Sequence, residues 1–185
     1  FSRVSDFKEN FKKTKLTYTA FFIQAAAASL QKYPVVNSSV DGHDILYKKD
    51  INIGCAVATD SGLIVPVLKR AQEYKKIEDI ALQLQTLIEK TKNKKLLPTD
   101  VIGGTFSITN MGMYGSIHSQ PIINQPQVAI MSIGAIVERG VVEKGKIVIR
   151  PMCNIGLTFD HRVVDGHEGA LFLKDIKEFL ENYSG

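Results

Sequence analysis

The chain has 185 residues and a formal net charge of +4; 44% of its residues are apolar, 23% are charged and 8% are aromatic. This is the composition of an average soluble domain, so it excludes a disordered tail, a collagen-like repeat and a disulfide-stapled miniprotein. No stretch of about 18 apolar residues occurs, so the sequence predicts no membrane-spanning helix.

The first quarter of the chain predicts a helix followed by a hairpin. Residues 18–32 have the spacing of a helix with a buried face, and Pro34 ends it. Residues 37–40 and 45–47 predict two strands around an Asp-Gly turn.

The next elements are two strands and the clearest helix of the sequence. Residues 51–59 predict one strand and residues 63–68 the returning strand, in which Pro66 requires a sheet edge or a bulge. Residues 77–92 predict a helix. Its apolar stripe consists of Ile77, Ile80, Ala81, Leu84, Leu87 and Ile88.

After Pro98 the sequence predicts strands again and then a final helix over residues 166–182. The inward face of this helix is formed by Leu173, Ile176, Phe179 and Leu180. The predicted strands are residues 104–109, 128–137, 147–149 and 152–159. This order of helices and strands fits a mixed α/β (α+β) fold with helices on one face of a sheet.

The positive charge is concentrated in residues 69–95, whose eight basic and four acidic side chains account for the whole net charge. Either a solvated helix face or an attraction for a polyphosphate or an acidic partner explains this segment. We expect neither nucleic acid nor a membrane as a partner.

The two cysteines, Cys55 and Cys153, lie about a hundred positions apart, each within an apolar run. They form no Cys-x-x-Cys pair and have no metal-ligand spacing. The sequence therefore predicts two buried free thiols in a reducing compartment.

The strongest candidate for chemistry is His161. Ile155, Leu157 and Phe159 alternate along a predicted strand, and His161 continues their phase where the strand should end. An imidazole at the mouth of a rigid strand is well placed to act as a general base.

Structural roles remain alternatives for the same segment. His161 can be a hydrogen-bonded structural histidine, and Asp165 can cap the final helix. Asp160 and Arg162 can form an ion pair that holds the turn. A metal site of His161, Asp165 and His167 is a further alternative, although the neighbouring arginine would repel a cation.

The segment Asp-His-Arg-Val-Val-Asp-Gly of residues 160–166 closely resembles the signature of the dihydrolipoamide acyltransferases, the core subunits of 2-oxoacid dehydrogenase complexes. Residues 62–67, 103–112 and 121–130 resemble three further motifs of this family, in the same order. The chloramphenicol acetyltransferases share the trailing His-x-x-x-Asp-Gly but carry a second histidine where this chain has Asp160. The resemblance therefore favours the lipoamide branch.

The resemblance implies a chloramphenicol-acetyltransferase-like fold, in which a mixed sheet carries helices on one side. It implies a homotrimer that builds a larger cage, with residues 1–185 as the catalytic core domain. We expect lipoyl and peripheral-subunit-binding domains to precede Phe1 in a full-length subunit. The implied partners are a lipoyl domain and, through those N-terminal domains, the decarboxylase and dihydrolipoamide dehydrogenase subunits. The expected location is the cytoplasm in a prokaryote or the mitochondrial matrix in a eukaryote.

The implied reaction passes an acyl group between the dihydrolipoyl thiol of a lipoyl domain and the substrate coenzyme A, without a metal. By this resemblance His161 is the general base, and Thr109 donates a hydrogen bond to the oxyanion of the tetrahedral intermediate. Asp165 is the second active-site residue, which we expect to orient the loop and the histidine.

The resemblance also implies contacts with coenzyme A at Lys8, Thr17, Asn110 and Gly134. Lys8 stands where the family has arginine, so it keeps the charge but loses the bidentate fork. Gly134 has no Cβ, which would let a ligand approach the backbone.

Alternatives to this function remain open. We expect a branched-chain or acetyl group, and the succinyltransferase of the 2-oxoglutarate complex is the alternative. A catalytically silent core or scaffold subunit is a second alternative, although such subunits tend to lose the motif histidine. A metal-dependent hydrolase is a third.

Overall fold

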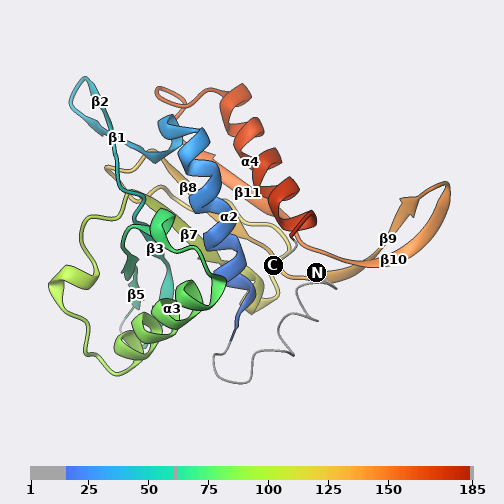
Figure 1. Cartoon of the computed structure of the whole chain (residues 1–185), viewed down its shortest axis with the longest axis horizontal. Coiled ribbons are helices and arrows are strands. Elements are labelled where there is room, and N and C mark those ends of the chain that lie inside the picture. Colours follow the sequence, from blue (N-terminus) through green and yellow to red (C-terminus); the bar gives the residue numbers. More distant parts are fainter. Residues whose placement is uncertain (1–15, 61, 184–185) are drawn as a thin grey trace.

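The computed structural model describes residues 16–60 and 62–183, which are organised around a five-stranded mixed sheet (Figure 1). The strand order is β11-β8-β7-β3-β6. The strands are β3 (Ile53–Cys55), β6 (Val67–Leu68), β7 (Phe106–Asn110), β8 (Ala129–Ile133) and β11 (Ile155–Phe159). β7 is parallel to both of its neighbours, whereas the edge strands β6 and β11 are antiparallel to theirs.

Three helices, α2 (Tyr18–Lys32), α3 (Ile77–Lys92) and α4 (Gly166–Glu181), cover one face of this sheet (Figure 1). α2 packs between the other two and contributes fully buried alanines, which allow close contact. Phe172 of α4 meets Phe106 of β7 with ring centroids 5.7 Å apart. The predicted mixed α/β fold with helices on one side is confirmed.

The opposite face of the sheet is covered by the loop between β7 and β8. Side chains alternate along a strand, so Ser107 and Ser132 point away from the helices. The Ser107 hydroxyl donates to the Gln127 side chain at 2.7 Å, and the Ser132 hydroxyl donates to the Ser119 carbonyl at 2.9 Å. These hydrogen bonds hold the loop against the sheet.

In the described part of the chain, three two-stranded hairpins lie outside the main sheet. They are β1 (Ser38–Asp41) with β2 (Asp44–Tyr47), β4 (Val57–Thr59) with β5 (Gly62–Ile64), and β9 (Val137–Glu143) with β10 (Lys146–Met152). The β9–β10 hairpin projects far from the body of the molecule (Figure 1).

Three predicted strands are each divided in two. Residues 51–59 form β3 and β4, because at Ala56 the chain leaves the sheet after donating to the Ile108 carbonyl at 2.9 Å. Residues 63–68 form β5 and β6, interrupted at Pro66, and β6 is a sheet edge as Pro66 requires. Residues 128–137 contain all of β8 and only the first residue of β9.

The predicted helices agree well with the structure. α2 and α3 have the predicted bounds, and α4 ends one residue early. The inward face of α4 differs in part, since Phe172 and Ile176 are fully buried while Leu173, Phe179 and Leu180 are half-buried. Within the described residues, no helix is long and apolar enough to cross a membrane.

Candidate active site

His161 lies exposed just beyond the end of β11, with its ring centroid 5.6 Å from that of Phe159. The predicted ion pair beside it is present: the Arg162 guanidinium donates to both carboxylate oxygens of Asp160, at 2.6 and 3.0 Å. This interaction holds the pKa of Asp160 below its ordinary value. The Asp160 carbonyl also accepts the backbone N–H groups of residues 163 and 164, both at 3.0 Å. The turn that carries His161 is therefore held firmly.

Asp165 caps the N-terminus of α4, as its sequence context predicts. Its carboxylate accepts the backbone N–H of His167 at 3.0 Å and that of Glu168 at 3.5 Å. The loop that presents His161 is thus anchored by one carboxylate at each end.

The alternative of a metal site at this loop is wrong. In the part of the chain that the structure describes, no group of three or more His, Cys, Asp or Glu side chains could hold a metal ion. His161, Asp165 and His167 are all described residues and form no such group.

Thr109, in β7, lines a cavity of about 600 Å³ together with Thr17 and Asn110. Thr109 is only 8% exposed, and its hydroxyl makes no hydrogen bond to any described residue. The Thr17 hydroxyl is buried and also has no partner within residues 16–60 and 62–183. The Asn110 amide donates to the Thr19 hydroxyl at 3.2 Å. The structure therefore brings three of the predicted site residues to one cavity, which two unpaired hydroxyls adjoin.

The rest of this cavity is lined by α3 and the end of β3. Leu84 and Ile88 supply apolar walls, whereas Lys92 adds a cation. Burial raises the pKa of the Cys55 thiol, which also lines the cavity, to about 12. This thiol stays protonated at neutral pH, so it does not act as a competing nucleophile.

Gly134, another of the predicted coenzyme A residues, does not line this cavity. Gly134 is buried directly after β8, and a Cβ there would clash with the Ile117 carbonyl oxygen. The group that lies close to this glycine is therefore a backbone carbonyl of the chain itself. Lys8 lies outside the described residues.

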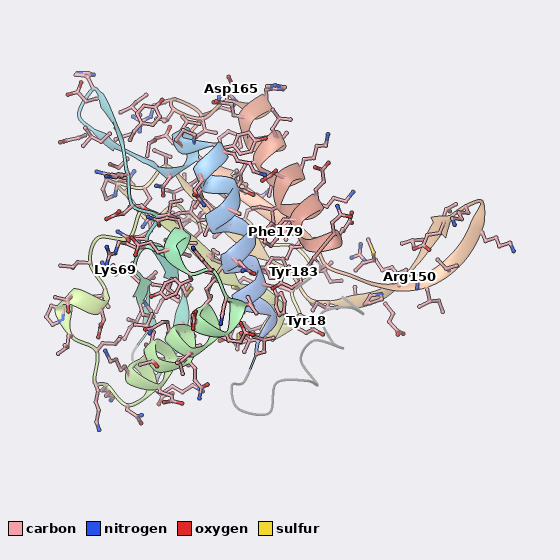
Figure 2. The ribbon with its side chains drawn as sticks, in the orientation of Figure 1. Tyr18, Lys69, Arg150, Asp165, Phe179 and Tyr183 are labelled. Carbon is pink, nitrogen blue, oxygen red and sulfur yellow. The ribbon has the colours of Figure 1, made fainter. Side chains whose placement is uncertain are left out.

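The two catalytic candidates occupy opposite ends of the sheet. Thr109 of β7 pairs with Ser132 of β8, which in turn pairs with Gly156 of β11. His161 follows Gly156 by five residues and lies beyond the C-terminal end of β11. Five residues of extended chain and two strand spacings separate the pair by roughly 20 Å. In Figure 2 the labelled Asp165 and Tyr18 lie far apart. Asp165 is four residues from His161, and Thr17, next to Tyr18, lines the same cavity as Thr109. One copy of the chain therefore does not bring Thr109 and His161 together.

Several residues of the cavity were not predicted. Thr19, in the first turn of α2, carries the same hydroxyl group as Thr17 at the N-cap of this helix, and this pair of threonines is a signal that could have found it. Gln85 has no such signal, because a polar helix face is by default solvated. Lys92 belongs to the basic segment of residues 69–95, for which the sequence offers an attraction for a polyphosphate or an acidic partner as one explanation.

A family model for the catalytic domain of 2-oxoacid dehydrogenases acyltransferase matches residues 2–185. The chain is 45% identical over 181 residues to the dihydrolipoyllysine-residue succinyltransferase component of the 2-oxoglutarate dehydrogenase complex of Rickettsia typhi, covering 96% of this chain and 45% of the relative. It is 46% identical over 179 residues to the lipoamide acyltransferase component of the branched-chain alpha-keto acid dehydrogenase complex of Bacillus subtilis, covering 95% and 42%. The chain thus spans less than half the length of these curated relatives.

Solved structures agree. The cubic core of the pyruvate dehydrogenase multienzyme complex matches with a TM-score of 0.89 at 31% identity, covering 98% of this chain and 74% of that chain. A chloramphenicol acetyltransferase matches with a TM-score of 0.57 at 12% identity, a likeness of fold alone, and confirms the predicted fold class. The resemblance seen in four sequence motifs is confirmed over nearly the whole chain. The chain therefore belongs to the 2-oxoacid dehydrogenase acyltransferase family, as its catalytic domain.

Proposed function

We propose that this chain transfers an acyl group between the dihydrolipoyl thiol of a lipoyl domain and coenzyme A in a 2-oxoacid dehydrogenase complex. The observation that carries the proposal is that two side chains are available for chemistry. The imidazole of His161 is exposed on a firmly held loop, and the hydroxyl of Thr109 has no partner among the described residues. A base and an oxyanion donor are the two groups that thioester exchange requires.

His161 acts as the general base. A free thiol has a pKa of about 8.5, so only a few per cent is thiolate at pH 7. The neutral imidazole takes the thiol proton while the sulfur attacks the thioester carbonyl. When the intermediate collapses, the imidazolium returns this proton to the departing sulfur. General-base assistance of this kind contributes roughly 10²–10⁴-fold in rate.

Thr109 stabilises the tetrahedral intermediate. The carbonyl oxygen becomes negatively charged as the sulfur attacks, and the free Thr109 hydroxyl donates a hydrogen bond to it. Because the hydroxyl has no hydrogen bond to break within the described chain, it is available without prior rearrangement. Asp165 fixes the start of α4 and so positions the loop of His161, without exchanging protons itself.

The reaction needs two copies of the chain, because the base and the donor of one copy lie roughly 20 Å apart. A closed ring in which the His161 end of each copy meets the Thr109 end of the next completes every site. The homotrimer expected for the family is such a ring. The likeness to a cubic multienzyme core supports its further assembly into a cage.

Coenzyme A is a substrate of the proposed reaction, with contacts at Thr17 and Asn110 in the cavity beside Thr109. Contacts at Lys8 and Gly134 remain part of the proposal. The lipoyl group arrives on a separate domain. In the full-length subunit, that domain and a peripheral-subunit-binding domain connect this core with the decarboxylase and dihydrolipoamide dehydrogenase subunits. Both curated relatives are bacterial, which supports a cytoplasmic location.

The test is acyl transfer to free dihydrolipoamide by the purified chain, with acetyl-, isobutyryl- and succinyl-coenzyme A as parallel donors. The chain is nearly equally identical to a succinyl and a branched-chain relative, so this panel identifies the acyl group. We expect turnover with one preferred donor, and a loss of roughly 10²–10⁴-fold in His161→Ala.

The matched control is His43→Ala, which removes an exposed imidazole from the turn between β1 and β2. It should keep the wild-type rate. Transfer that persists near the wild-type rate in His161→Ala would refute the role of the base. A chain that assembles normally but transfers no acyl group from any donor would instead be a scaffold.

A further inference from the structure

The ring of Phe159 lies against the imidazole of His161, with the ring centroids 5.6 Å apart and the ring planes tilted by 41°. His161 is exposed, and its imidazole makes no hydrogen bond or ion pair with any residue in 16–60 and 62–183. An exposed side chain without a fixed neighbour exchanges between rotamers. Within the described chain, the contact with Phe159 is therefore what holds the imidazole in one orientation.

Phe159 is itself placed by α4. It is the last residue of β11, and α4 packs beside this strand (Figure 1). Gly169 of α4 is buried, and a Cβ built on it would lie 2.9 Å from Cε1, 3.3 Å from Cδ1 and 3.4 Å from Cζ of the Phe159 ring. Carbon atoms in favourable contact are about 3.5–4.0 Å apart, so a side chain at Gly169 would displace the ring. One edge of the ring therefore rests directly on the helix backbone.

Glycine at position 169 has no other explanation in the local structure. Gly169 is the fourth residue of α4, and glycine inside a helix is less favourable than alanine. Its φ angle is not positive, so the backbone does not require glycine. What the glycine supplies is the space that the Phe159 ring occupies.

We propose that Phe159 is a positioning residue for His161 and that Gly169 provides the space in which its ring takes up that role. The consequence for the chemistry rests on the proposed function, in which the imidazole takes a thiol proton. A general base must lie within hydrogen-bond reach of its proton, and a misplacement of about 1 Å can reduce a rate roughly 10²-fold. A phenyl ring carries no acid or base, so Phe159 acts only through the imidazole.

The experiment is a double-mutant cycle of Gly169→Ala and Phe159→Leu, measured by steady-state acyl transfer. Gly169→Ala displaces the ring, and Phe159→Leu removes it, so each should lower kcat about 10-fold and leave KM for coenzyme A within about 2-fold of wild type. Leucine lacks the ring atoms Cε1 and Cζ, which lie closest to position 169 together with Cδ1. The double variant should therefore stay within about 2-fold of Phe159→Leu alone.

Two matched variants on α4 serve as controls. Ala170→Ser adds one atom at the exposed position next to Gly169, and Phe179→Leu removes a half-buried ring that contacts Tyr183 instead of the imidazole. Both should keep kcat within about 2-fold of wild type. Thermal melts of all variants verify that they are folded at the assay temperature.

A second readout does not need activity. The ring current of Phe159 shifts the NMR signal of the His161 Cε1 proton, which is identified by its absence in His161→Ala, and this signal should move in both single variants. An unmoved signal, a wild-type kcat in either single variant, or losses that multiply in the double variant would overturn the inference. A signal that moves in a chain whose wild type transfers no acyl group would keep the positioning contact and refute the proposed function.

Discussion

At Thr109 the proposed chemistry depends on one hydroxyl group. Thr109→Val replaces it with a methyl of similar size, and no described residue loses a hydrogen-bond partner. We expect transfer to fall by about 10²–10³-fold, because one oxyanion donor is lost. Thr109→Ser keeps the donor and should stay within about tenfold of wild type. The assay is steady-state transfer with the preferred donor; equal rates in Val and Ser variants would show that the hydroxyl takes no part.

The ion pair of Asp160 predicts how the stability of the folded chain depends on pH. Hydrogen bonds from Arg162 lower the pKa of this carboxyl, so its charged form stabilises the folded chain. That contribution is fully present above the unfolded-chain pKa of about 3.9 and is lost as the pH falls through the lower folded-state pKa. We therefore expect Asp160→Asn to melt below wild type at pH 7, with the difference shrinking in acid. Thermal melts from pH 7 to pH 2, with exposed Asp50→Asn as control, measure this; a difference independent of pH would contradict it.

At the scale of elements, α4 depends on its cap. Asp165→Ala removes the acceptor for two backbone N–H groups and should lower the free energy of unfolding by about 1 kcal/mol. Asp165→Asn keeps an acceptor and should change it by only a few tenths of that amount. Chemical denaturation with parallel activity assays checks both variants. If Asp165→Asn unfolded like wild type yet lost transfer, the charge of Asp165 would act on the chemistry itself.

The helices could be predicted from sequence because each combines a long apolar stripe with a clear end signal, such as Pro34 after α2 or Asp165 before α4. The strands were less predictable. A continuous apolar run such as residues 51–59 shows no sign that the chain leaves the sheet at Ala56. The β9–β10 hairpin had a usable signal in Gly145, because glycine readily adopts the positive φ angle that this residue has in the tight turn.

The candidate site was predictable in part, and for a physical reason. His161 and Asp165 belong to one short segment, so a sequence motif contains their local geometry. The cavity beside Thr109 combines β3, β7, α2 and α3, and only the fold brings these elements together. Residues such as Gln85 therefore had no local signal. The separation of Thr109 from His161 likewise follows from strand directions, which the motifs do not encode.

At the scale of the whole molecule, shared sites predict complementation between inactive variants. His161→Ala keeps Thr109, and Thr109→Val keeps His161. When the two are mixed after reversible dissociation, about a quarter of the sites in random rings receive both intact groups. We expect transfer to recover to about a quarter of the wild-type rate. Mixing the variants without dissociation is the control, and no recovery in the exchanged sample would show that each site lies within one copy.

On the proposed function, the opposite placement of Thr109 and His161 also makes activity depend on the concentration of the chain. A newly made chain carries a base without an oxyanion donor at one end of its sheet and a donor without a base at the other. On the proposed function, a single copy therefore has no complete site while the chain is dilute. Activity begins only when copies associate, so the concentration of the chain determines whether the active sites form.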